Sequence, residues 1–125
     1  WVSQAHQIGC PVFAIPAHNS IMYALALSGL NGQAFSFHGY VPKEQHQRLK
    51  KLETLYRTCR MSGATQIFIE APFRNKYCFD DLKKSIPKDM KCRVVSQIMS
   101  RNQSVQFLED MTTIDAVPSV FLIGH

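Results

Sequence analysis

The sequence predicts an α/β domain with a mixed, largely parallel sheet of about five strands flanked by helices. Short apolar runs alternate along the chain with segments of helical periodicity, which is typical of folds whose helices cover the faces of a sheet. The 125 residues are 46% hydrophobic and 18% charged, a composition that fits one globular domain over residues 1–125. No internal repeat, low-complexity tract or linker divides the chain.

Five segments have strand patterns. Residues 34–40 alternate between apolar and polar side chains and place Phe35 and Phe37 on one face, which predicts a half-buried strand. Short apolar runs predict four more strands, at residues 11–15, 66–69, 93–99 and 118–123. The polar connection over residues 101–115 carries no predicted element.

Three helices are predicted between the strands. Residues 21–30 are apolar on nearly every side, and Asn19 or Ser20 can cap that helix. Residues 43–61 have an amphipathic pattern with an apolar face and a basic exterior. The apolar face is Leu49, Leu52, Leu55, Tyr56 and Cys59, and the basic exterior is Lys43, Arg48, Lys50, Lys51, Arg57 and Arg60. The third helix begins at Pro72, a residue suited to a first helical position, and Phe79, Leu82 and Ile86 mark its apolar face.

Charge and cysteine content narrow the function classes. A net charge of +5 and a pI near 9.2 favour an anionic partner such as RNA. No apolar stretch approaches the roughly 20 residues of a membrane span, so we expect a cytoplasmic protein without a membrane segment. The four cysteines, Cys10, Cys59, Cys78 and Cys92, lack metal-ligand spacing and are expected to be free buried thiols, with no metal bound.

Four segments carry a resemblance to a known superfamily. Residues 8–30, which include Pro11-Val and Pro16-Ala-His-Asn-Ser20, are similar to a G-x-P-V-x-x-x-P-G-P-S-A stretch followed by a small-residue helix that ends in S-G-L. Phe37-His-Gly-Tyr-Val-Pro-Lys43 is similar to a G-F/Y-L-P-R/K segment. Ile67-Phe-Ile-Glu-Ala-Pro-Phe-Arg-Asn75 resembles F-Y-E-A-P-H-R, with Phe73 in place of its histidine. Together with the closing strand at residues 119–125, this order resembles the C-terminal domain of the tetrapyrrole (corrin/porphyrin) methylase superfamily, in particular its ribosomal RNA small subunit methyltransferase I group.

The resemblance implies half of a two-domain methyltransferase that uses S-adenosylmethionine and works as a homodimer. The N-terminal domain, with a glycine-rich G-G-D-x-x-x-Y-G loop, would precede Trp1, and the cofactor would bind in the cleft between the domains. A fragment with only the second domain would be inactive and would bind the cofactor weakly. The cofactor-binding residues that the resemblance implies are Asn19, Ser20, Glu70 and Met99, with Pro16 and Ala71 beside them.

The implied reaction is methyl transfer to a ribose hydroxyl of ribosomal RNA. Such a displacement needs chiefly in-line positioning, because the sulfonium is already a good leaving group. Glu70 is the carboxylate that could take the hydroxyl proton, and Lys43 and Arg74 could bind RNA phosphates.

Alternative readings stay open for each assignment. Asn19 and Ser20 could serve only as helix caps, Glu70 could simply pair with Arg74, and the basic helix face could be merely solvated. The acceptor could instead be a tetrapyrrole ring carbon. The chain could also be a non-catalytic RNA-binding or dimerisation module, because residues 97–101 do not match the group's R-E-L-T-K run.

Overall fold

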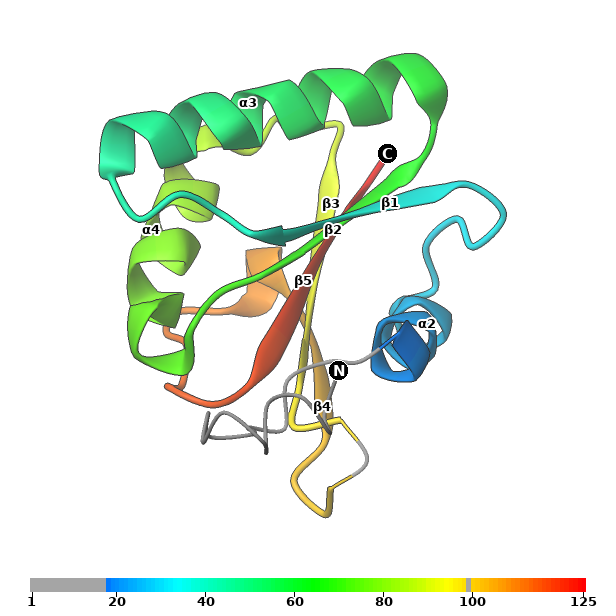
Figure 1. The fold of residues 1–125 in the computed structure, drawn as a ribbon, viewed down its shortest axis with the longest axis vertical. Helices are drawn as coiled ribbons and strands as arrows, with labels where there is room; N and C mark the ends of the chain where they lie inside the picture. Colours follow the sequence, from blue (N-terminus) through cyan, green and yellow to red (C-terminus); the bar gives the residue numbers. More distant parts are fainter. Residues whose placement is uncertain (1–17, 99) are drawn as a thin grey trace, which may run out of the picture.

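The computed structural model describes residues 18–98 and 100–125 of the chain (Figure 1). The predicted strand at residues 11–15 lies outside the described residues. The helices are α2 (His18–Ser28), α3 (Gln45–Ser62) and α4 (Asn75–Ser85), with the short 3₁₀ helices η1 (Pro72–Arg74) and η2 (Leu108–Asp110). The strands are β1 (Phe35–Tyr40), β2 (Thr65–Ile69), β3 (Lys91–Ser96), β4 (Ser104–Phe107) and β5 (Ser119–Gly124).

The strands form a mixed five-stranded sheet in the order β1-β2-β5-β3-β4. The prediction of an α/β domain with a mixed sheet flanked by helices is confirmed, but its description as largely parallel is wrong. Among the strands of the described residues, only β1 and β2 pair in parallel, whereas β5 runs antiparallel to both of its neighbours and β4 runs antiparallel to β3. The reason is that β5 inserts between β2 and β3, which run in the same direction but never pair with each other.

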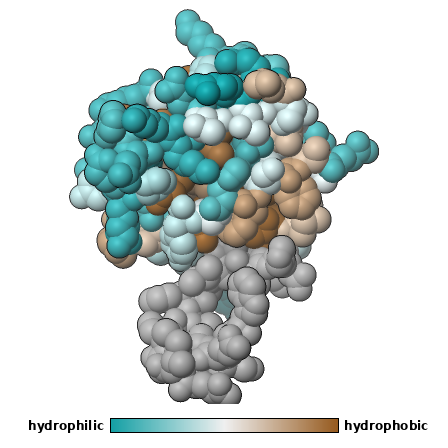
Figure 2. Space-filling model, turned by 45° about the horizontal axis from the view of Figure 1, so that its top comes forward, coloured by the Kyte–Doolittle hydropathy of each residue, from teal (hydrophilic) through white to brown (hydrophobic). Residues whose placement is uncertain are grey.

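Two apolar layers cover the central strands, because successive side chains of a strand point to opposite faces. Phe68 and Phe121 stack with ring centroids 5.2 Å apart in the larger core, beneath α3 and α4. Ile67 and Leu122 belong to the smaller core beneath α2. Figure 1 shows the long α3 crossing one end of the sheet, with α4 and α2 on opposite sides of the molecule. Figure 2 shows hydrophilic residues over the α3 end and apolar side chains toward the α2 side.

Helix α3 follows its predicted periodicity at four of five apolar positions. Leu52, Leu55, Tyr56 and Cys59 are buried, while Leu49 is half-buried. The helix begins after Glu44, whose carboxylate accepts hydrogen bonds from two backbone N–H groups of the first turn, and it ends at Gly63 in the left-handed conformation (φ 73°). The prediction that Arg48 lies on the exterior is wrong: its side chain is 5% exposed, because it pairs with Asp81 of α4.

Four other local predictions differ from the structure. Strand β1 is an edge strand, and Phe35 and Phe37 are exposed because α2 packs against β3 and β5 rather than β1. Strand β3 ends at Ser96, three residues earlier than predicted. Strand β4 lies within the connection that had no predicted element. Helix α2 begins at His18, so Asn19 and Ser20 lie in its first turn rather than at the predicted cap position.

The described cysteines behave as predicted. Cys59, Cys78 and Cys92 are free and buried, whereas Cys10 lies outside the described residues. Burial raises the pKa of the Cys92 thiol to about 12 and raises that of Cys78 well above its usual range. These thiols are therefore protonated parts of the core and not nucleophiles.

Candidate functional site

The carboxyl ends of β1, β2 and β3 meet at one edge of the sheet, because these three strands run in the same direction. Ile69 at the end of β2 lies opposite Val120, and Val120 lies opposite Val95 near the end of β3. Glu70 and the start of the turn that follows β3 therefore lie at the same edge of the sheet. Of the predicted cofactor-binding set, Pro16, Met99 and the side chains of Asn19 and Ser20 lie outside the described residues.

Glu70 is buried directly after β2, with 2% of its side chain exposed. Its Oε1 accepts a hydrogen bond from the backbone N–H of Ala71 at 2.8 Å and lies 3.5 Å from Nε of Arg74. The pairing with Arg74 is the alternative that the sequence left open for this residue. Its Oε2, however, has no hydrogen-bond partner among the described residues, which leaves one buried carboxylate oxygen free to accept a hydrogen bond.

Asn75, the first residue of α4, is a buried polar residue that the sequence analysis did not single out. It is 1% exposed, and its Nδ2 donates hydrogen bonds to the carbonyl oxygens of Val117 (2.8 Å) and Asp115 (3.2 Å). These bonds tie the connection before β5 to the start of α4. The signal in the sequence was an amide side chain directly after the Glu-Ala-Pro-Phe-Arg segment, at the start of a helix that must pack against the sheet.

Unsatisfied polar atoms concentrate at this place. Among the described residues, four buried side-chain nitrogen or oxygen atoms lack a hydrogen-bond partner, and three of them are Glu70 Oε2, Arg74 Nε and Asn75 Oδ1. A buried polar atom without a partner costs about 1–3 kcal/mol, so such atoms are rare and often mark a place where a ligand binds. We therefore take Glu70, Arg74 and Asn75 as the candidate site.

A polar hollow adjoins the candidate site on the β3–β4 side. It has a volume of about 290 Å³, and hydroxyl and amide side chains dominate its lining, which is Ser96, Gln97, Asn102, Ser104, Gln106, Asp115 and Val117. Ser96 and Ser119 connect the hollow to Asn75. The hydroxyl oxygens of the two serines lie 2.9 Å apart, and Asn75 Nδ2 lies 3.4 Å from the hydroxyl oxygen of Ser119. The edge of the sheet thus offers neutral hydrogen-bonding groups beside one buried carboxylate.

The two predicted substrate-binding cations occupy different surroundings. The guanidinium of Arg74 lies between Glu70 and Phe73, with its Cζ 4.6 Å from the Phe73 ring centroid. Lys43 is exposed and lines a second hollow of about 360 Å³ between α3 and α4, together with Tyr77. The structure therefore places Arg74 at the candidate site and Lys43 on the neighbouring helical surface.

Metal binding and membrane insertion have no support in the described part of the chain. Within residues 18–98 and 100–125, no group of three or more His, Cys, Asp or Glu side chains is arranged to hold a metal ion. No helix in these same ranges combines the length and the apolar character needed to cross a membrane.

Several known proteins are similar to this chain in sequence. No family model matches the chain. Ribosomal RNA small subunit methyltransferase I of Halalkalibacterium halodurans is 38% identical over 81 residues, which cover 65% of this chain and 27% of that protein. The protein of the same name from Xylella fastidiosa is 31% identical over 100 residues, which cover 80% of this chain and 35% of that protein. The chain is homologous to ribosomal RNA small subunit methyltransferase I.

Solved structures agree with this homology at the level of the fold. The methyltransferase CobJ superposes with a TM-score of 0.52 at 16% identity, and the match covers 97% of this chain and 54% of that one. A putative diphthine synthase from Entamoeba histolytica superposes with a TM-score of 0.59 at 15% identity, over 98% of this chain and 56% of that one. These superpositions show a shared fold, and the sequence matches confirm the predicted resemblance to ribosomal RNA small subunit methyltransferase I. This chain spans about half of each solved neighbour and about a third or less of these curated relatives.

Proposed function

We propose that this chain is the C-terminal, cofactor- and substrate-binding half of a two-domain methyltransferase that transfers a methyl group from S-adenosylmethionine to a ribose hydroxyl of ribosomal RNA. The observation that carries the proposal is the homology to ribosomal RNA small subunit methyltransferase I over up to 80% of the chain. The match to only about half of each solved neighbour supports a second domain in the working enzyme. We further propose a homodimer in the cytoplasm, where ribosomal subunits are present.

The candidate site suits such a cofactor chemically. S-adenosylmethionine carries hydroxyl and amino groups, which donate hydrogen bonds, and Glu70 Oε2 and Asn75 Oδ1 are buried acceptors without partners in the described structure. We propose that these two residues and Ala71 hold the cofactor together with Pro16, Asn19, Ser20 and Met99. When bound, the cofactor would supply an activated methyl group on a sulfonium, a good leaving group.

Glu70 is also the residue that we propose takes the proton of the attacking hydroxyl. Its Oε1 accepts a hydrogen bond from Ala71 and lies beside Arg74, which orients the carboxylate, and Oε2 has no partner among the described residues. Because a carboxylate oxygen has two lone pairs, Oε2 can accept from the cofactor and from the attacking hydroxyl. A general base must lie within hydrogen-bond reach of the proton that it removes. A buried carboxylate that is held in one orientation can satisfy this geometric requirement. Arg74 and Lys43 would bind phosphates of the RNA.

Transfer of a tritiated methyl group from S-adenosylmethionine to purified small ribosomal subunits tests the proposal in the full-length enzyme. We expect label in the RNA, resistant to protease, with a 2′-O-methyl nucleoside found by mass spectrometry after digestion. Label on a tetrapyrrole but not on RNA would replace the RNA substrate by the alternative one. No cofactor binding by calorimetry at millimolar concentration would show a non-catalytic module and refute the enzyme.

A matched pair of variants tests the role of Glu70. We expect Glu70→Gln to lower kcat by about 10²-fold or more, within the usual range for a lost general base. Cofactor affinity should fall less, because the amide keeps one oxygen that can accept the cofactor's hydrogen bond. Glu53→Gln makes the same change on the exposed surface of α3 and should leave kcat unaltered. Equal loss of cofactor affinity and of kcat in Glu70→Gln would instead indicate that Glu70 binds the cofactor but does not take the proton.

A further inference from the structure

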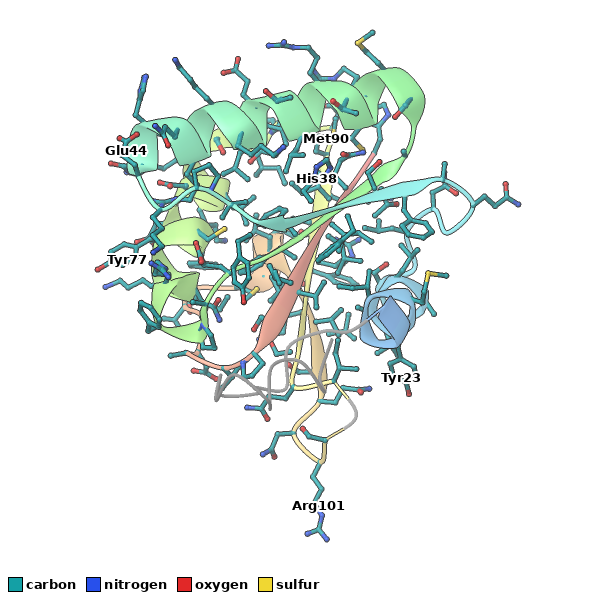
Figure 3. The ribbon with its side chains drawn as sticks, in the orientation of Figure 1. Tyr23, His38, Glu44, Tyr77, Met90 and Arg101 are labelled. Carbon is teal, nitrogen blue, oxygen red and sulfur yellow. The ribbon has the colours of Figure 1, made fainter. Side chains whose placement is uncertain are left out.

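The short helix η1 and the first turn of α4 each carry a large aromatic side chain that the fold does not bury. Phe73 is 71% exposed and Tyr77 is 57% exposed. Phe73 lies in η1, which leads directly into α4, and Tyr77 is the third residue of α4, so the two exposed rings are close together along the chain. Figure 3 shows Tyr77 pointing away from the sheet into solvent. We call Phe73, Arg74, Tyr77, Lys84 and Lys43 the aromatic–basic strip.

Cations flank both rings of the strip. Arg74 stacks on one face of Phe73, with 4.6 Å between its Cζ and the ring centroid, and leaves most of that ring in solvent. Lys43 and Lys84 line the hollow of about 360 Å³ beside Tyr77. The hollow also contains Arg48 and Asp81, which neutralise each other, so Asp80 is the remaining anion against the two lysines. The strip is therefore basic as well as aromatic.

The strip is continuous with the candidate site. Arg74 contacts the Phe73 ring on one side and lies 3.5 Å from Oε1 of Glu70 on the other. From there the strip follows the outer face of α4 to the hollow between α4 and the start of α3. A chain-like ligand bound along it would arrive at the buried carboxylate that we propose accepts the proton.

We propose that the aromatic–basic strip binds a single-stranded segment of the RNA substrate, with bases stacked on Phe73 and Tyr77 and phosphates near Lys43 and Lys84. The inference rests on the proposed function and adds the form of the RNA that is recognised. Aromatic rings beside cations are the usual platform for single-stranded nucleic acid, because every base has a face that can stack. Paired RNA keeps its bases stacked inside the duplex, so it cannot use exposed rings in this way.

Fluorescence anisotropy with a labelled 12-nucleotide single-stranded RNA tests the strip in the full-length protein. We expect Phe73→Ala and Tyr77→Ala each to weaken binding by about fivefold or more, the smallest effect usual for a lost base stack. Tyr77→Phe keeps the ring and should bind as the unmodified protein does. The same RNA annealed to its complement should bind more weakly than the single strand.

Phe107→Ala provides the matched control. Phe107 is another partly exposed ring (42%) beneath an arginine, with Arg93 Cζ 3.8 Å from its centroid. It lies on the edge strand β4, outside the aromatic–basic strip. We expect no change in RNA affinity from this variant. Thermal unfolding of all variants shows whether each remains folded, and because Phe73 and Tyr77 are exposed, their replacement should leave the melting temperature nearly unchanged.

Three outcomes would overturn the inference. Unchanged RNA affinity in both alanine variants would refute the role of the strip. It would not affect the proposed function, which depends on methylation of RNA by the unmodified protein. Equal binding of the duplex would remove the single-strand preference. A change of oligomeric state in Phe73→Ala without a change in RNA affinity would make the strip a protein interface. Failure of the unmodified protein to bind or methylate any RNA would instead refute the RNA substrate itself.

Discussion

The buried ion pair between Arg48 and Asp81 leads to a quantitative prediction about stability. The two side chains are 5% and 2% exposed, and Asp81 also accepts a hydrogen bond from Gln45 Nε2 at 3.2 Å. In Asp81→Ala both bonds are lost and a guanidinium stays buried without its counter-charge. Removing one partner of a buried pair typically costs about 3–5 kcal/mol. Arg48 keeps one bond, from Nη1 to the Lys43 carbonyl oxygen at 2.9 Å, so we expect the lower end, about 3 kcal/mol.

Urea unfolding followed by circular dichroism measures this change in the free energy of unfolding. Asp80→Ala is the matched control, because it removes the same carboxylate from an exposed position of the same helix and should change stability by at most about 0.5 kcal/mol. The double variant Arg48→Met, Asp81→Leu should recover most of the loss, because an apolar pair of similar volume can replace a buried ion pair. A loss below about 1 kcal/mol in Asp81→Ala would refute the reasoning.

Three further predictions follow from local features. Glu44→Ala should lower the melting temperature at pH 7. The cap hydrogen bonds depress the pKa of Glu44 below its usual 4.5, so the carboxylate stabilises the fold above pH 4.5, and the difference from the unmodified protein should shrink as pH falls through the lowered pKa. In a Cys10→Ser variant, Ellman's reagent at pH 8 should react with no thiol until urea unfolds the protein, because burial keeps Cys59, Cys78 and Cys92 protonated. Rapid labelling of the folded protein would contradict this prediction. Lys43→Ala should reduce the slope of log affinity for single-stranded RNA against log salt concentration by about 0.7, one phosphate contact, whereas Lys88→Ala, exposed outside the strip, should not.

The elements that the sequence predicted well are those whose pattern is set by burial alone. The repeat of Leu52, Leu55, Tyr56 and Cys59 defines α3 because one face of that helix packs on the sheet. Strands β2 and β5 were predicted from continuous apolar runs, and both are buried along their whole length. Strand β4 was missed because it is an edge strand of only four residues with little burial. Its alternation of Ser, Val, Gln and Phe is too short to stand out within an otherwise polar connection.

Predictions that depend on contacts distant in sequence were less successful. Arg48 has the sequence environment of an exposed residue, and only the packing of α4 places Asp81 against it. The sheet was expected to be largely parallel because strands alternate with helices, but sequence order does not reveal that the last strand is inserted in the centre. At the candidate site, Glu70 and Arg74 were predicted from the resemblance, whereas the role of Asn75 depends on carbonyl groups some 40 residues later in the chain.

The central position of β5 has a consequence for how the chain folds during synthesis. Strands β1 and β2 pair with each other, and so do β3 and β4. Among the described strands, these two pairs are joined by β5 alone, which the ribosome makes after all of them. Until residues 119–124 have left the exit tunnel, the nascent chain holds two separate ribbons with apolar faces exposed. Such late, long-range pairing slows folding and leaves intermediates prone to aggregation, so a pause or truncation before β5 should recruit chaperones.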